Sequence, residues 1–136
     1  MIILLLVLFF RNLKKVVLSL IPVVTGMLFM IGVMGGLGIT FNLFNVVAAI
    51  LIIGLGVDYG IFMVTKISQG LDAATERAVF VSGLTTIAGF GALVLARHPA
   101  LHSIGLSVLI GIGAAIPAAL VIIPAMYRKK IKISDE

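Results

Sequence analysis

The chain has 136 residues, of which 62% are hydrophobic and 11% are charged, and it contains no cysteine. A soluble domain of this length cannot bury so much apolar surface, so the composition excludes the soluble classes and indicates a protein of the lipid bilayer. The lack of cysteine excludes a disulfide framework and thiol chemistry.

Four apolar runs are long enough to cross a membrane, which takes about 20 helical residues. We expect spanning helices at residues 16–37, 43–67, 79–96 and 102–126. Residues 1–10 are also apolar, but ten helical residues rise only about 15 Å, which is half of a bilayer core. We interpret them as the end of a truncated helix, and the chain as a fragment of a longer protein. The predicted fold is a single all-α integral membrane domain over residues 1–136.

A polar segment separates the second and third full helices. Leu71, Ala74, Thr75 and Ala78 repeat at helical spacing, which favours a short cytoplasmic surface helix at about residues 70–78. An ordinary polar loop with one helical turn fits the same residues equally well. Residues 127–136 form the expected cytoplasmic tail.

The basic residues predict the topology, because lysine and arginine mark the cytoplasmic side of short loops. If the loops alternate across the membrane, Arg97 is external and the other nine basic residues share the cytoplasmic side with the C-terminus; they are Arg11, Lys14, Lys15, Lys66, Arg77, Arg128, Lys129, Lys130 and Lys132. The net charge of +5 then reflects contacts with lipid headgroups, and we expect no nucleic-acid partner.

Small residues repeat along two of the predicted helices, and small residues mark close helix contacts in membranes. The last helix has a stripe of residues four apart, namely Ser103, Ser107, Gly111, Ala115 and Ala119. The helix before it has Ser82, Thr85, Thr86, Gly89 and Ala92 on a common face. Gly54 and Gly56 precede Asp58, and Gly54 leaves one turn of bare backbone beside the acid. We therefore expect a tight bundle with a partner helix close to Asp58, although glycine is also common in membrane helices.

Asp58 and Tyr59 interrupt an apolar run near the predicted midplane of the membrane. A charged carboxylate there costs about 2.5 to 3.5 kcal/mol, so the acid should face protein or water. A carboxyl group that can be neutral or charged inside the membrane can carry protons, and a tyrosine can hydrogen-bond to it. Because adjacent residues point about 100° apart on a helix, each should reach across to another helix. The structural alternative is a protonated aspartate that only joins helices.

Other chemistry finds no support in the sequence. Gly54, Gly56 and Gly60 have the spacing GxGxxxG, which is not the dinucleotide fingerprint. His98 and His102 are four apart with Pro99 between them, and we interpret them as interfacial histidines rather than metal ligands. No serine or threonine has a histidine partner nearby in sequence. We expect neither an enzyme nor a metal or other cofactor.

These residues resemble a known family. The run Gly54-Leu-Gly-Val-Asp58-Tyr59 is similar to the GxxxDY motif of the resistance-nodulation-division superfamily, in its MMPL-like branch. The segment Ser82-Gly-Leu-Thr-Thr86-Ile-Ala-Gly-Phe90 resembles the next membrane helix of that family, and Ala73, Ala74 and Glu76 resemble its surface helix. The stretch from Leu101 to Tyr127 resembles the final helix of the C-terminal half. The resemblance covers almost the whole chain.

The resemblance implies a proton-driven exporter of lipids or other hydrophobic molecules in the bacterial inner membrane. Such transporters have two membrane halves of six helices each, with an extracytoplasmic domain in each half. Asp58 would carry the proton and Tyr59 would be its hydrogen-bonding partner across the interface between the halves. The partners would be membrane lipids, the substrate, and the other half or another copy. Two alternatives stay open: a non-transporting lipid- or sterol-sensing bundle, and a small self-assembling membrane protein.

Overall fold

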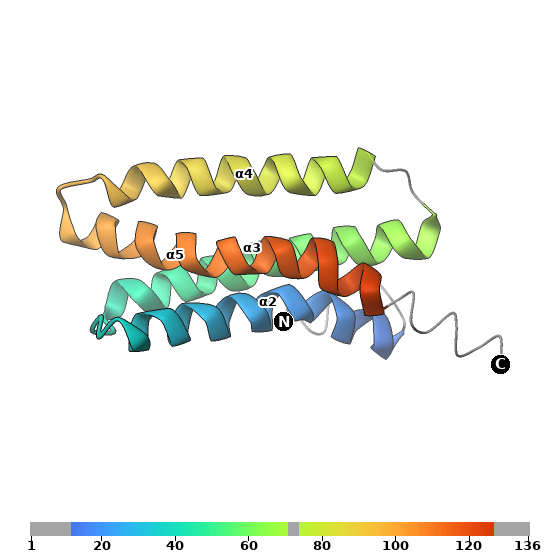
Figure 1. Ribbon diagram of the computed structural model, residues 1–136, viewed down its shortest axis with the longest axis horizontal. Coiled ribbons are helices and arrows are strands. Elements are labelled where there is room, and N and C mark those ends of the chain that lie inside the picture. Colours follow the sequence, from blue (N-terminus) through green and yellow to red (C-terminus); the bar gives the residue numbers. More distant parts are fainter. Residues whose placement is uncertain (1–11, 71–73, 127–136) are drawn as a thin grey trace.

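The computed structural model describes residues 12–70 and 74–126, and this part of the chain is built from helices (Figure 1). In chain order these are α2 (Leu13–Gly36), α3 (Leu43–Gln69), α4 (Ala74–Val94), α5 (Pro99–Pro117) and the π-helix η1 (Ala118–Ile122). With α5 and its continuation to Met126 taken as one span, four helices are long and apolar enough to cross a membrane. The expected all-helical membrane fold is confirmed.

Local signals in the sequence explain where these helices begin and end. Asn12 and Asn42 are the N-caps of α2 and α3, and each side chain accepts a hydrogen bond from a backbone N–H of the first turn. Gly70 ends α3 in the left-handed conformation, at φ 66°, which glycine adopts without steric cost. Pro99 lies in the first turn of α5, where a missing N–H costs nothing.

The structure differs from the sequence expectation at the start of α4. We expected a surface helix at residues 70–78 and a separate spanning helix from residue 79, but one helix runs without a break from Ala74 to Val94. The physical reason is that no glycine or proline occurs between Ala74 and Ser82, so nothing interrupts the backbone hydrogen bonds. Residues 71–73, the truncated helix expected at residues 1–10 and the tail at residues 127–136 lie outside the described residues.

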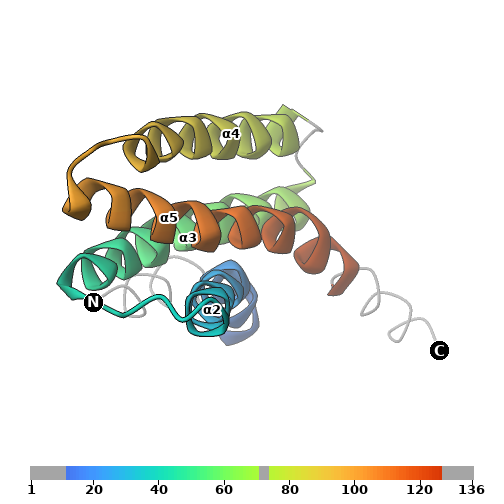
Figure 2. The same ribbon diagram turned by 60° about the vertical axis from the view of Figure 1, so that its left-hand side comes forward.

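Helix α5 is the centre of the bundle. It packs against α2, α3 and α4, whereas α3 and α4 touch each other only sparsely. In Figure 1, α5 and α3 form the middle of the molecule, with α4 on one side and α2 on the other. The turned view in Figure 2 keeps α4 apart from α2. The bundle therefore has a well-packed side, made of α2, α3 and α5, and a looser side, where α4 stands beside α3.

The well-packed side depends on glycines at the helix crossings. A Cβ added at Gly26 would lie 2.8 Å from the carbonyl oxygen of Gly111 and 3.3 Å from the Cβ of Ala115, so α2 and α5 meet backbone to backbone. The small residues of the α5 stripe lie in this region, and Ser107, Gly111, Ala115 and Ala119 are buried. Close approach of this kind is what holds helices together in lipid, because lipid provides little hydrophobic drive.

Two prolines lie inside the helices and have different surroundings. Pro22 is buried in the continuous helix α2. Pro117 ends the α-helical part of α5, and the next five residues, Ala118–Ile122, form a π-helix. A proline lacks the N–H that the α-helical pattern needs, and a π-helical turn is one way to accommodate that loss.

Candidate functional site

The GLGVDYG segment, residues 54–60, places side chains on two opposite faces of α3. Gly56 and Gly60 face α2: an added Cβ at Gly56 would lie 3.2 Å from the backbone nitrogen of Val23, and one at Gly60 would collide with the carbonyl of Ser19. Asp58 lies two residues from each glycine, about 200° around the helix, and therefore on the opposite face. It is exposed. The close contact with α2 thus turns the carboxyl group away from the packed core.

Tyr59 points elsewhere and is buried, with only 3% of its surface exposed. Its hydroxyl group donates a hydrogen bond to Thr86 Oγ1 on α4, at 3.3 Å. Thr86 Oγ1 in turn donates to the backbone carbonyl of Ser82, at 2.9 Å. A chain of two hydroxyl groups therefore joins α3 to α4 in a region where the two helices otherwise have few contacts.

A cleft of about 240 Å³ lies between α3 and α4 beside these residues. Its lining comes from Leu55, Asp58, Tyr59 and Phe62 on α3 and from Ala78, Val79 and Ser82 on α4. Most of the lining is apolar, and Asp58 supplies its one carboxyl group. The arrangement places a titratable group at the edge of a cleft, next to a fixed hydroxyl pair.

The position of Asp58 along α3 puts this group deep in the membrane. The helix has 27 residues, from Leu43 to Gln69. By the rise of an α-helix, Asp58 lies about 22 Å from its first residue and about 16 Å from its last. The middle of the helix is Gly56, so Asp58 lies about 3 Å along the axis from the helix midpoint, and both ends of the helix are at least half of a bilayer core of about 30 Å, or about 15 Å, away from it. A carboxyl group at this depth is expensive to leave facing hydrocarbon.

The structure does not bring all of the predicted packing residues into contacts. Gly54 shares the face of Asp58 and is exposed, and an added Cβ there would meet no heavy atom within 4 Å. Ser82 and Thr85 are exposed on α4, and Thr86 is half-buried. Ser107 and Gly111 are buried on α5, where an added Cβ at Gly111 would collide with the side chain of Ile52. Among the described residues, α4 lies across the cleft that Asp58 lines, and it leaves the acid exposed.

Sequence reasoning missed a buried polar cluster near the start of α3. The Asn45 side chain is fully buried and donates to Ser107 Oγ at 2.7 Å and to Ser103 Oγ at 3.3 Å. Asn42 also bonds Ser103, at 3.0 Å, so the cluster ties α3 to α5. The signal was present in the sequence: asparagines three apart at a helix start form a capping box, and such an asparagine can also reach a serine stripe.

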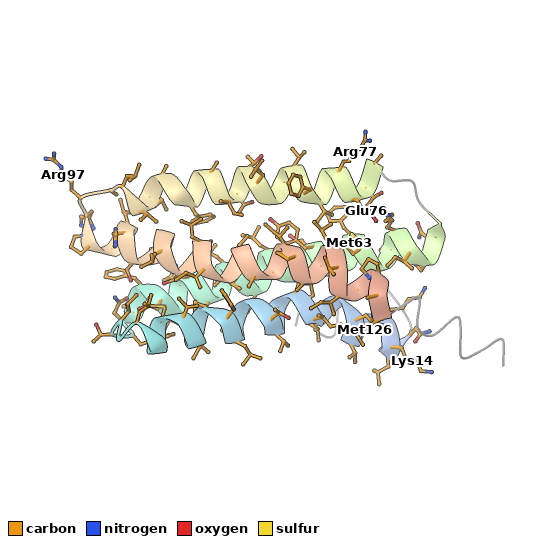
Figure 3. The ribbon with its side chains drawn as sticks, viewed as in Figure 1. Lys14, Met63, Glu76, Arg77, Arg97 and Met126 are labelled. Carbon is orange, nitrogen blue, oxygen red and sulfur yellow. The ribbon has the colours of Figure 1, made fainter. Side chains whose placement is uncertain are left out.

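Polar contacts join α4 to its neighbours at both of its ends. An ion pair links Lys66, in the last turn of α3, to Glu76, in the first turn of α4. At the other end of α4, His102 Nδ1 lies 2.7 Å from the carbonyl oxygen of Val94; this oxygen can only accept, so the imidazole donates. Figure 3 shows Lys14, Glu76, Arg77 and Met126 toward one end of the bundle and Arg97 at the other. We call these the Lys14 end and the Arg97 end.

In the part of the chain that the structure describes, histidine, aspartate and glutamate side chains do not gather in groups of three that could hold a metal ion. His102 is used in the contact with Val94. The polar groups beside the cleft are the carboxyl group of Asp58 and the hydroxyl groups of Tyr59 and Ser82.

Comparisons with known proteins give the chain a family. The model of the MMPL family matches residues 1–128. The chain is 31% identical to the hopanoid transporter HpnN of Rhodopseudomonas palustris, over 92% of this chain and 15% of that protein. It is also 31% identical to a putative membrane protein of Methanocaldococcus jannaschii, over 92% of this chain and 36% of the relative. The HpnN protein of Burkholderia multivorans is 27% identical, over 88% of this chain and 14% of its own length.

The chain thus spans about a seventh to a third of the length of these relatives. No solved structure matches it significantly. The family match covers nearly all 136 residues, and the helices have the length and apolarity of membrane spans. The chain is an integral, multi-pass membrane protein of the MMPL family.

Proposed function

We propose that this chain forms part of an exporter of lipids or other hydrophobic molecules that is driven by protons, and that Asp58 carries the proton. The observation that carries the proposal is the exposure of a mid-membrane carboxyl group beside a cleft, on the face of α3 opposite its contact with α2. Two of the relatives are hopanoid transporters, which supports a lipid-like substrate.

The cost of exposure makes a purely structural role for Asp58 hard to sustain. The group joins no helices: among the described residues, its side chain makes neither a hydrogen bond nor an ion pair. Facing hydrocarbon in the charged form costs about 2.5 to 3.5 kcal/mol. A further membrane-spanning part, either the rest of the same transporter or another copy, would cover this face and supply partners for the carboxyl group.

The hydroxyl pair gives Tyr59 a different role from that of Asp58. Its O–H is directed at Thr86, 3.3 Å away, and Thr86 is itself held by the Ser82 carbonyl. This bond fixes the ring beside the cleft that Asp58 lines. In the proposed relay Tyr59 positions the surroundings of the acid, and its hydroxyl group can exchange Thr86 for a partner across the interface when that partner is present.

We further propose that the Lys14 end is cytoplasmic, as is the C-terminus. Lys14, Lys66 and Arg77 belong to this end, whereas Arg97 lies at the other end (Figure 3). The basic residues of short loops favour the cytoplasmic side. Labelling of a single cysteine at position 98, but not at position 15, by an impermeant reagent added to intact cells is the expected result. Labelling at position 15 alone would reverse the orientation.

Replacement of Asp58 tests the relay. Asp58→Asn keeps the shape of the side chain but cannot titrate, so the full-length protein should express and fold while proton-coupled export falls to background. Asp58→Glu, which still titrates, is the matched control and should keep part of the activity. Proton flux into proteoliposomes with a pH-sensitive dye inside, measured with substrate present, provides the readout. Undiminished flux through a well-folded Asp58→Asn protein would remove Asp58 from the proton path.

A further inference from the structure

A second cleft, of about 560 Å³, lies at the Arg97 end, between the α2–α3 connection and the α4–α5 connection. Five residues of its lining carry hydrogen-bond donors in their side chains, namely Thr40, Asn42, Arg97, His102 and Ser103. Met34, Ile39 and Leu106 supply an apolar part of the lining. The volume is in the range of small-molecule sites, which is about 300 to 1,000 Å³. The lining suits a ligand that is polar at one end and apolar at the other.

The charged group of this cleft is positive. Arg97 is its fixed cation, and the lining includes no aspartate or glutamate. Within residues 12–70 and 74–126 the two carboxyl groups belong to Asp58, in the middle of α3, and to Glu76, which pairs with Lys66 at the Lys14 end. No described carboxylate is therefore available to neutralise Arg97. A guanidinium group binds a phosphate through two parallel hydrogen bonds, and bonds of this kind are among the stronger ones in proteins.

The walls of the cleft are held in place by contacts already described. Asn42 caps α3 and bonds Ser103, and Asn45 ties the same serine to the core. His102 bonds the carbonyl of Val94 and so fixes the end of α4 against the start of α5, on either side of Arg97. The side chains of Thr40 and Arg97 make no hydrogen bond to another described residue. Their donors are left for a ligand on a frame that is already organised.

The position of the cleft along the membrane normal indicates that its anionic ligand is a lipid headgroup. The cleft lies at the ends of all four spanning helices, next to Gly36, Leu43, Val94 and Pro99, which is the level of the lipid headgroups. We propose that this cleft binds the phosphate headgroup of an anionic phospholipid from the adjacent leaflet, with Arg97 as the charged contact and the apolar lining beside the first part of the acyl chain. The proposal does not depend on the proton relay or on transport.

A local fluorescence reporter tests this site separately from the basic Lys14 end, which attracts anionic lipids in any case. The 136 residues contain no tryptophan, and Phe41, next to Thr40, is exposed, so Phe41→Trp places a reporter beside the cleft. Quenching by brominated phosphatidylglycerol is compared with quenching by brominated phosphatidylcholine of the same chains, in bilayers of mixed composition. We expect preferential quenching by phosphatidylglycerol, and a loss of this preference by about tenfold in Arg97→Gln.

Arg77→Gln is the matched control, because it removes the same charge from an exposed site at the Lys14 end. It should leave the preference unchanged. A second pair, Thr40→Glu and Thr40→Gln, covers the case in which Arg97→Gln does not fold: the glutamate should abolish the preference, and the glutamine should keep it. Equal quenching by both lipids in the Phe41→Trp protein, or an unchanged preference in Arg97→Gln, would overturn the proposal. So would loss of the preference when soluble glycerol phosphate is added at millimolar concentration, because the site would then take a free anion.

Discussion

The two opposite faces of α3 have different surroundings: one packs against α2, and the other is exposed. On one face, Gly56 and Gly60 let the backbone of α2 approach so closely that an added Cβ would press against Val23 or collide with Ser19. On the other face, Gly54 has no neighbour within 4 Å of an added Cβ, and Asp58 and Phe62 are exposed. The three glycines of the motif therefore have two different environments. Gly56 and Gly60 pack α3 against α2, whereas Gly54 lies on the exposed face, which a further part of the transporter could cover.

The same contrast extends to α4 and α5, which pack against each other along their length. Seven residues of α5 are buried but only Val79 and Gly83 of α4 are. Helix α4 packs closely against α5, touches α3 only sparsely and exposes most of its surface, as expected for a helix at the edge of a bundle in lipid. In this molecule that edge adjoins the open face of α3, so Asp58 lies at the border between the packed bundle and its surroundings.

The largest expected effect comes from filling the packed face of α3. Gly60→Val forces a side chain against the backbone of Ser19, which cannot move without shifting α2, and should destabilise the protein by more than about 3 kcal/mol or prevent folding. Gly54→Val, on the open face of the same helix, should change stability by less than about 0.5 kcal/mol. Thermal unfolding in detergent, followed by circular dichroism, measures both. Equal tolerance would contradict the assignment of the two faces.

A smaller effect is expected on α5, where the neighbour is a side chain. Gly111→Leu would push against Ile52, which can adjust its rotamer, so the cost should be about 1 to 3 kcal/mol. Gly113→Leu makes the same change at an exposed site of the same helix, where an added Cβ meets nothing within 4 Å. Both variants gain the same helix propensity, so the difference between their unfolding temperatures isolates the packing term. No difference would mean that the small-residue stripe is not a close contact.

The sequence predicted the helices well because the bilayer imposes a simple requirement on length and apolarity. It could not predict which glycines are in contact. The position of Gly54, four residues before Asp58, predicts a close helix contact, yet this same spacing puts it on the exposed face. The pair Gly56 and Gly60, also four apart, makes the contact with α2. By helical spacing alone, the face with Gly54 and Asp58 and the face with Gly56 and Gly60 are equally good candidates for a helix contact. The position of α2 in the bundle determines which of the two is packed.

In the candidate site, too, the sequence predicts positions along one helix but not contacts between helices. The depth of Asp58 follows from counting residues along one helix, but the partner of Tyr59 depends on how α4 lies beside α3. The helical wheel correctly separates Asp58 from Tyr59, since adjacent residues point about 100° apart. It does not identify Thr86, which lies 27 residues further along the chain. The buried cluster around Asn45 went unnoticed because an asparagine in an apolar run is a weak signal until a second helix brings serines to it.

The smallest expected effect concerns the bond between Tyr59 and Thr86, the one hydrogen bond that links the middle of α3 to α4 among the described residues. Tyr59→Phe and Thr86→Val should each lower stability modestly, and the double variant should lose less than the sum of the two. The coupling energy should be about 0.6 kcal/mol, which is the average for hydrogen bonds between membrane helices. Thr85→Val is the control, because Thr85 bonds the carbonyl of Val81 in its own helix, and it should show no coupling to Tyr59→Phe. Equilibrium unfolding in mixed micelles, measured for each single variant and for the double variant, gives this coupling energy. A coupling energy of zero would mean that Tyr59 is held by burial alone, and that the ion pair between Lys66 and Glu76 at the Lys14 end is the polar contact that joins α4 to α3 among the described residues.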